Sequence, residues 1–189
     1  EKDSIGINTS SSPIPSRGDW RYLYFNGADV GTSLYYCVVR YGGRAYNHSA
    51  YDKRYNSLWL NDSQVNISNS VIEESYASSY NDYPGTIYLE SNASATLTNV
   101  IVRENSHCGI NSNGSLNMSN CEIYDNGNYG VYCGGSNSAF IENHIYSNPG
   151  YGLTCAGNNS LFTGNNIHNN SGNGLDYNQD YGTFENNTL

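Results

Sequence analysis

Four charged residues could act together on a sugar chain. Arg40, Glu73 and Arg103 follow one another at intervals of 33 and 30 residues, and Glu104 stands directly after the last of them. A polysaccharide lyase needs a cation to neutralise a uronate and a base to remove a proton. A glycoside hydrolase needs two carboxyl groups, about 5 to 5.5 Å apart in retaining enzymes and about 6.5 to 9.5 Å apart in inverting ones. A row of ion pairs across neighbouring strands would explain the same residues without catalysis.

Aromatic residues form a second set that could bind a ligand. Rigid amphipathic rings suit sugar faces and protein partners, because they lose little rotamer entropy on binding. We expect four of them to stand in one outward column and to form the ligand-binding face: Tyr24, Trp59, Tyr88 and Tyr132. The alternative is that they are ordinary strand-forming residues packed under nearby loops.

The sequence gives little sign of a metal or a cofactor. It contains no acid-rich calcium loop, no H-E-x-x-H and no G-x-S-x-G. The four histidines, His48, His107, His144 and His168, are scattered, and the five cysteines form no C-x-x-C pair. We therefore predict no metal site and no cofactor, and we expect the cysteines to be core residues.

Composition limits the possible partners. A formal net charge of -9 would repel the phosphate backbone of nucleic acids, and no apolar run approaches the roughly 20 residues that cross a bilayer. Nucleic acid and membrane insertion are therefore not expected. Acceptor sequons for N-glycosylation favour an extracellular or cell-surface location, and they begin at Asn8, Asn47, Asn61, Asn66, Asn92, Asn113, Asn117, Asn158, Asn169 and Asn186.

A repeat supplies the fold that would align these distant residues. Glycine followed by an aliphatic residue recurs in the second half of the chain, at intervals of 21, 22 and 22 residues: Gly109-Ile110, Gly130-Val131, Gly152-Leu153 and Gly174-Leu175. Two further columns keep the 22-residue interval, one through Met118, Phe140, Phe162 and Phe184 and one through Ile123, Ile145, Ile167 and Leu189. A unit this short cannot bury its apolar face alone, so the units must stack.

The register predicts an all-β chain of about seven rungs, each with three short strands and about 22 residues in a regular coil. Residues 1–189 would form a single domain. Within it, 1–19 form a partial rung and lead-in, 20–104 form longer coils with insertions at 40–57 and 73–86, and 105–189 form the regular coils. Asparagines that recur at the turns are expected to form hydrogen-bonded ladders.

The Gly-Ile/Val/Leu strands followed by N-x-I turns resemble the right-handed parallel β-helix proteins of the pectate-lyase-like superfamily. The segment Pro13–Gly43 is similar to a first-coil pattern of secreted and surface proteins of bacteria and archaea. The resemblance implies a β-helix, and it leaves lyases, hydrolases, adhesins and non-catalytic modules open. The paired-Asp and Arg-x-Lys signatures of pectin-degrading members are absent from this sequence.

The leading hypothesis is a non-catalytic module that binds glycans or protein partners through the aromatic face, which the insertions flank. Polysaccharide cleavage at Arg40, Glu73, Arg103 and Glu104 is one alternative. A structural role is the other, because open rungs at both ends could pair with neighbouring domains or with copies of the chain and build a fibre. The expected partners are thus a polysaccharide or glycoprotein surface, neighbouring domains, or the chain itself.

Overall fold

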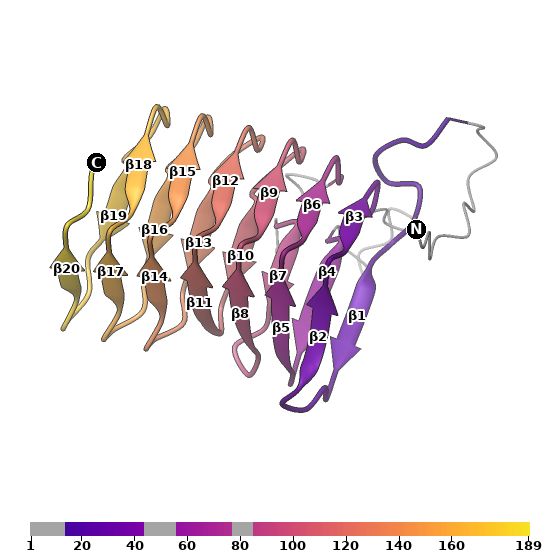
Figure 1. Ribbon diagram of the computed structural model, residues 1–189, viewed down its shortest axis with the longest axis horizontal. Helices are drawn as coiled ribbons and strands as arrows, with labels where there is room; N and C mark the ends of the chain where they lie inside the picture. The colour runs from indigo at the N-terminus through magenta and orange to yellow at the C-terminus, as the bar shows by residue number, and fades with distance from the viewer. Residues whose placement is uncertain (1–13, 44–55, 77–84) are drawn as a thin grey trace, which may run out of the picture.

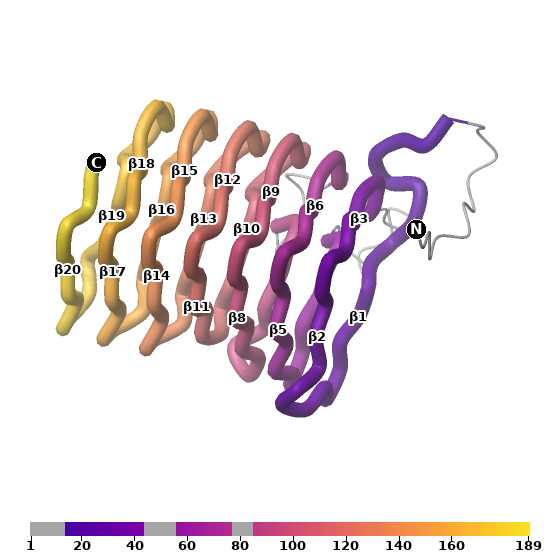
Figure 2. Tube along the Cα trace, viewed as in Figure 1, coloured from indigo at the N-terminus to yellow at the C-terminus, as the bar shows by residue number. Residues whose placement is uncertain are grey.

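The chain coils as a parallel β-helix in the computed structural model, which describes residues 14–43, 56–76 and 85–189. Successive coils lie side by side along the long axis; the first six contribute one strand to each of three sheets, and the last contributes strands to two of them (Figure 1). The tube along the chain shows the same path turning once per rung (Figure 2). The prediction of an all-β parallel helix with about seven rungs of three strands is confirmed.

The strands divide among sheets A, B and C. Sheet A contains β1 (Leu23–Asn26), β4 (Leu58–Asn61), β7 (Ile87–Leu89), β10 (Ile110–Ser112), β13 (Val131–Cys133), β16 (Leu153–Cys155) and β19 (Leu175–Tyr177). Sheet B contains β2 (Thr32–Tyr35), β5 (Gln64–Ser68), β8 (Ser94–Thr98), β11 (Ser115–Ser119), β14 (Ala139–Ile141), β17 (Leu161–Thr163) and β20 (Thr183–Glu185). Sheet C contains β3 (Val38–Arg40), β6 (Val71–Glu73), β9 (Ile101–Arg103), β12 (Glu122–Tyr124), β15 (His144–Tyr146) and β18 (Asn166–His168).

The core is a set of aligned columns that run down the inside of the rod. In sheet B, Phe140 pairs with Met118 on one side and with Phe162 on the other, as the 22-residue interval predicts. Both phenylalanines are fully buried, and their rings stack with centroids 5.2 Å apart. In sheet C the inward column passes through Ile123 and Ile145. The side chains that alternate with these columns point outward, so the register decides which residues reach the surface.

Hydrogen-bonded ladders of asparagine side chains stabilise the turns between the sheets. After sheet C, each amide nitrogen donates to the amide oxygen of the next rung, from Asn105 to Asn126, Asn148 and Asn170. A second ladder, between sheets B and C, links Asn143, Asn165 and Asn187. The expected ladders are therefore present, and they satisfy backbone groups that the turns remove from the sheets.

We expect Asn143→Ala to lower the free energy of unfolding by about 2 to 4 kcal/mol, because several buried polar groups would lose their partners at about 1 to 3 kcal/mol each. The Asn143 side chain accepts from the backbone nitrogen of Cys121 and donates to the carbonyl oxygen of Met118. Urea unfolding measures the loss. Asn66→Ala, on the exposed face of β5, is the matched control and should change stability by less than about 0.5 kcal/mol. Equal losses of unfolding free energy in the two variants would show that the hydrogen bonds of Asn143 do not stabilise the fold.

The five cysteines carry free thiols, as expected for core residues. Four are buried and Cys37 is half-buried. Burial raises the pKa of the thiols of Cys108 and Cys121 to about 11, so both stay protonated and unreactive at neutral pH. Cys133 and Cys155 pair on adjacent strands of sheet A. The Cys133 thiol donates toward Cys155, and this bond together with burial raises the pKa of Cys133.

The described segment before β1 packs against the corner between sheet C and sheet A. The Trp20 indole donates to the carbonyl oxygen of Arg40, and the Arg17 guanidinium donates to the carbonyl oxygen of Glu104. Most of the predicted insertions, residues 44–55 and 77–84, lie outside the described residues, as do residues 1–13. Within the described ranges, no helix is long and apolar enough to cross a membrane.

Candidate functional site

The outer face of sheet C gathers the charged residues that the sequence singled out. One outward column runs through six rungs in a continuous parallel register, and we call it the sheet C column: Arg40, Glu73, Arg103, Tyr124, Tyr146 and His168. Its first half is charged and its second half is aromatic. Each of these six residues directly follows a buried valine or isoleucine. Because successive side chains of a strand point to opposite faces, all six lie on the outer face.

The charged half is an ion-pair ladder. The Glu73 carboxylate binds the guanidinium groups of Arg40 and Arg103, with Nε of Arg103 donating to Oε2 of Glu73 at 2.9 Å. Glu73 is only 3% exposed, whereas about a third to a half of each arginine side chain reaches solvent. The carboxylate is thus neutralised on both sides, as the ion-pair interpretation of these residues requires.

Arg103 links the two halves of the column. Its Nη1 donates to the Tyr124 hydroxyl at 3.0 Å, and its guanidinium carbon lies 6.0 Å from the centroid of the same ring. The hydroxyl of Tyr124 first, and then the carboxylate of Glu73, raise the pKa of Arg103 above its ordinary value. Arg103 therefore stays a fixed cation and cannot exchange a proton with a substrate.

Glu104 takes a different position from the three residues of the ladder. It opens the turn after β9 with a left-handed φ of 55°, the conformation found at the equivalent Glu74 and Asp125. Its side chain is exposed, and its backbone carbonyl accepts the bond from Arg17. The structure therefore brings together Arg40, Glu73 and Arg103, while Glu104 projects from the corner of the rod.

The aromatic half consists of parallel rings. Tyr124 and Tyr146 stack with centroids 4.8 Å apart, and Tyr146 and His168 with centroids 5.5 Å apart, each pair at an interplanar angle of 9°. All three side chains are half-buried. Because each ring covers the face of its neighbour, the stack presents ring edges and polar atoms to the solvent. Such a surface offers hydrogen bonds more readily than it offers a flat face for a sugar ring.

His144 joins this stack from the neighbouring outward column of β15. Its Nε2 lies 2.7 Å from Nε2 of His168, and its ring centroid lies 4.3 Å from that of Tyr146. The sequence columns did not predict this pair, because His144 and His168 belong to different columns. The two histidines are diagonal neighbours on adjacent strands, since His144 pairs with Asn166 and Tyr146 pairs with His168. Diagonal neighbours on adjacent strands are within reach of long side chains, and this rule could have predicted the contact.

The expectation of an exposed aromatic column on sheet A is wrong at two of its four positions. Tyr24 is 44% exposed, but Trp59 is 6% and Tyr88 only 1% exposed, and Tyr132 is half-buried. Trp59 stacks on Tyr24 with centroids 4.1 Å apart and packs edge-on against Tyr22. Tyr22 and Tyr24 thus occupy the surface of the Trp59 ring that a ligand would need. The pairing along the five strands β1, β4, β7, β10 and β13 does follow the predicted register.

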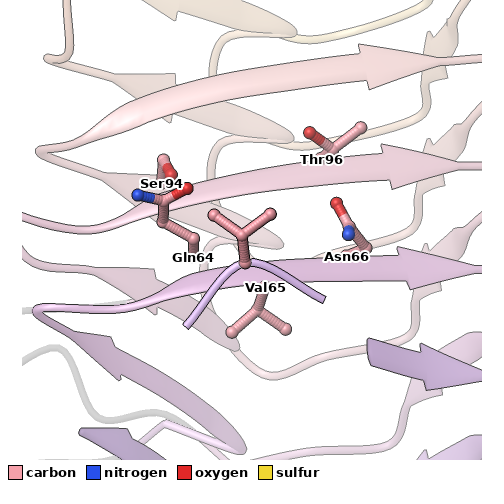
Figure 3. A pocket seen from close by; sticks show the side chains of 6 residues that line it. Gln64, Val65, Asn66, Ser94 and Thr96 are labelled. Atoms are coloured by element: carbon pink, nitrogen blue, oxygen red, sulfur yellow. The ribbon is translucent and has the colours of Figure 1, made fainter. Parts of the chain in front are cut away.

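A shallow hollow lies over sheet B, on strands β5 and β8. Gln64 and Ser94 stand together at one end, and Asn66 and Thr96 stand on the same two strands further along (Figure 3). Its volume is about 70 Å³, whereas pockets for small molecules usually measure about 300 to 1,000 Å³. This hollow is therefore too small to be a substrate pocket.

The predicted glycosylation sequons are mostly accessible. Asn61 is half-buried, Asn8 and Asn47 lie outside the described residues, and the others are exposed: Asn66, Asn92, Asn113, Asn117, Asn158, Asn169 and Asn186. Exposure is what a glycosylated asparagine needs. In the described part of the chain, no group of three or more His, Cys, Asp and Glu side chains is arranged to hold a metal ion.

Comparison with known proteins identifies a family by its repeat. The family model of the right-handed beta helix region matches residues 41–189, which is more than half of the chain. No curated protein and no solved structure matches the chain.

Proposed function

The chain belongs to the family of right-handed beta helix regions, and from this premise we propose that it is a non-catalytic module of an exported or cell-surface protein. The module binds a protein partner through the outer face of sheet C. The observation that supports this proposal is the sheet C column, whose charged ladder and half-exposed aromatic stack form one ordered surface over six rungs.

The charged ladder favours binding over catalysis. Glu73 would have to accept or donate a proton in either cleavage mechanism, but its carboxylate is buried between two arginines. The second carboxylate, on Glu104, projects into solvent from the turn after β9. A rigid ion-pair row with exposed arginine edges instead provides electrostatic complementarity for a partner.

A protein partner fits the surface better than a sugar does. The tyrosine faces of the sheet C column are covered by one another, so CH groups of a sugar have no open ring to lie on. The adjoining outward column begins with aliphatic residues, of which Val38 is 58% exposed and Val71 and Ile101 are half-buried. Tyrosine, arginine and aliphatic side chains together are typical of protein interfaces.

The proposal is tested with two tyrosines that lie on the same rung but on different faces. Tyr146 is on the outer face of sheet C, and Tyr132 is on the outer face of sheet A. We expect the wild type and Tyr132→Ala to capture the same protein from the extracellular fraction of the source cells. Tyr146→Ala should bind the purified partner about tenfold more weakly, the effect of losing an interface tyrosine worth about 1.4 kcal/mol.

Three results would contradict the proposal. Loss of binding in Tyr132→Ala but not in Tyr146→Ala would move the binding face to sheet A. Binding on a glycan array that Tyr146→Ala abolishes, without a protein partner, would make the surface a carbohydrate site. Release of reducing ends or unsaturated uronates by the wild type, but not by Glu73→Gln, would establish a polysaccharide lyase or glycoside hydrolase.

A further inference from the structure

Two imidazole rings face each other at the end of the sheet C column. The Nε2 atoms of His144 and His168 are 2.7 Å apart, the ring centroids are 4.9 Å apart, and the ring planes meet at 41°. Both side chains are half-buried, so one side of the pair is open to solvent. Neither the ion-pair ladder nor the inward core uses these nitrogen atoms.

A single tyrosine holds both rings. The Tyr146 ring lies 4.3 Å from the ring of His144, on the same strand, and stacks at 9° on the ring of His168, on the next strand. Backbone pairing between β15 and β18 keeps the two strands in register beneath them. The imidazoles are therefore positioned before any ligand arrives, which reduces the entropy lost on binding.

The surroundings favour a cation over an anion. Glu122 is the register neighbour of His144 on β12, and its side chain is exposed on the same outer face. Asp125 is exposed at the turn that follows β12. The nearest guanidinium group in this column, that of Arg103, is engaged by Glu73 and Tyr124. The chain as a whole carries a formal charge of -9, which adds to the attraction for positive ions.

We propose that His144 and His168 chelate one divalent transition-metal ion, with water molecules completing its coordination and the carboxylate of Glu122 adding negative charge nearby. Imidazole nitrogen suits Zn²⁺, Ni²⁺ and Cu²⁺, whereas Mg²⁺ and Ca²⁺ prefer sites made of oxygen atoms. Two Zn–N bonds of about 2.0 to 2.1 Å at a tetrahedral angle place the nitrogens about 3.3 Å apart. The observed separation of 2.7 Å needs only a small rotation of the two side chains.

Chelation also requires a defined proton arrangement. In the free pair, one Nε2 carries a hydrogen and donates it to the other. To bind a metal, both neutral rings carry their proton on Nδ1 and direct the Nε2 lone pair at the ion. No proton is gained or lost between two neutral rings; the donor ring changes its tautomer. This inference does not depend on the partner proposed above.

The test is a titration of the chelator-treated chain with Ni²⁺ and, separately, Zn²⁺, followed by calorimetry and by NMR of the imidazole nitrogens. We expect one equivalent to bind and to shift the signals of His144 and His168. His144→Ala and His168→Ala should each weaken binding by more than about 100-fold, because even losses of outer-shell partners weaken metal affinity by about 10- to 100-fold. Glu122→Gln should weaken it by a smaller factor.

His107→Ala is the matched control, because His107 lies at a different turn, where its Nε2 faces Asn128. This variant should bind the metal as the wild type does. Thermal melting adds a readout that does not depend on heats of binding: the metal should raise the melting temperature of the wild type and of His107→Ala, but not that of His144→Ala or His168→Ala. Absence of binding in the wild type, or unchanged affinity in His144→Ala and His168→Ala, would overturn the proposal.

Discussion

Phe162→Ala should lower the free energy of unfolding by about 3 to 5 kcal/mol, the usual loss when a buried phenylalanine is truncated. The Phe162 ring is fully buried and stacks between Phe140 and Phe184, with centroid distances of 5.2 and 4.8 Å. The ring of Tyr177 packs edge-on against that of Phe162, with centroids 5.4 Å apart. Neighbouring rungs are fixed by backbone pairing and cannot collapse into the cavity, so the loss should be near the upper part of this range.

Thr163 supplies the matched control, because it is the next residue of β17 and points to the outside. Thr163→Ala should lower the free energy of unfolding by less than about 1 kcal/mol. Urea unfolding followed by circular dichroism compares the two variants under the same conditions. Similar losses at positions 162 and 163 would mean that the alternation of inward and outward residues is misassigned.

The fold was predictable because period and alternation are properties of the sequence itself. The 22-residue interval brings Met118, Phe140 and Phe162 into one column, and the structure pairs them in that register. The same reasoning placed the asparagine ladders, since a stacked turn needs the same amide on each rung. It also placed Arg40, Glu73 and Arg103 side by side, as neighbours on successive strands.

Exposure was less predictable than register. An outward side chain is exposed to solvent only if no other segment packs over it. The repeat interval predicts the direction of a side chain but not such packing. Tyr22, which directly precedes β1, packs on Trp59, and the hydroxyl of Tyr88 accepts a hydrogen bond from Asn113, which lies beyond the next strand of sheet A. The sequence pattern correctly placed these rings on the outer side, but contacts made by other segments bury them.

The diagonal contact between His144 and His168 was missed for a related reason. The repeat aligns residues at the same position of successive rungs, and His144 and His168 occupy different positions in their rungs. In the structure the two rings cross the boundary between columns and meet at Nε2. The length of a side chain, rather than its register, determines such contacts.

Trp59→Ala should destabilise the fold by about 3 kcal/mol or more, because the indole is buried and a truncated tryptophan leaves a large cavity. Its Nε1 donates to Oε1 of Glu90 at 3.1 Å, and its ring stacks on Tyr24 and contacts Tyr22 in an edge-to-face arrangement. A residue that only presented its ring to a ligand would show the opposite result, with unchanged stability and weaker binding. The melting temperature and the urea midpoint both report the difference.

Two further variants separate the causes of the destabilisation expected in Trp59→Ala. They are Trp59→Phe and Tyr132→Ala. Trp59→Phe keeps most of the buried area but loses the bond to Glu90, so it should destabilise by less than Trp59→Ala. Tyr132→Ala removes a half-buried ring from the same face of sheet A and should lower the free energy of unfolding by about 1 kcal/mol. If Trp59→Ala instead unfolds at the wild-type urea concentration and loses a ligand, the outer face of sheet A is a binding surface after all. In that case the packing of Tyr22 and Tyr24 on the indole must open when the ligand binds.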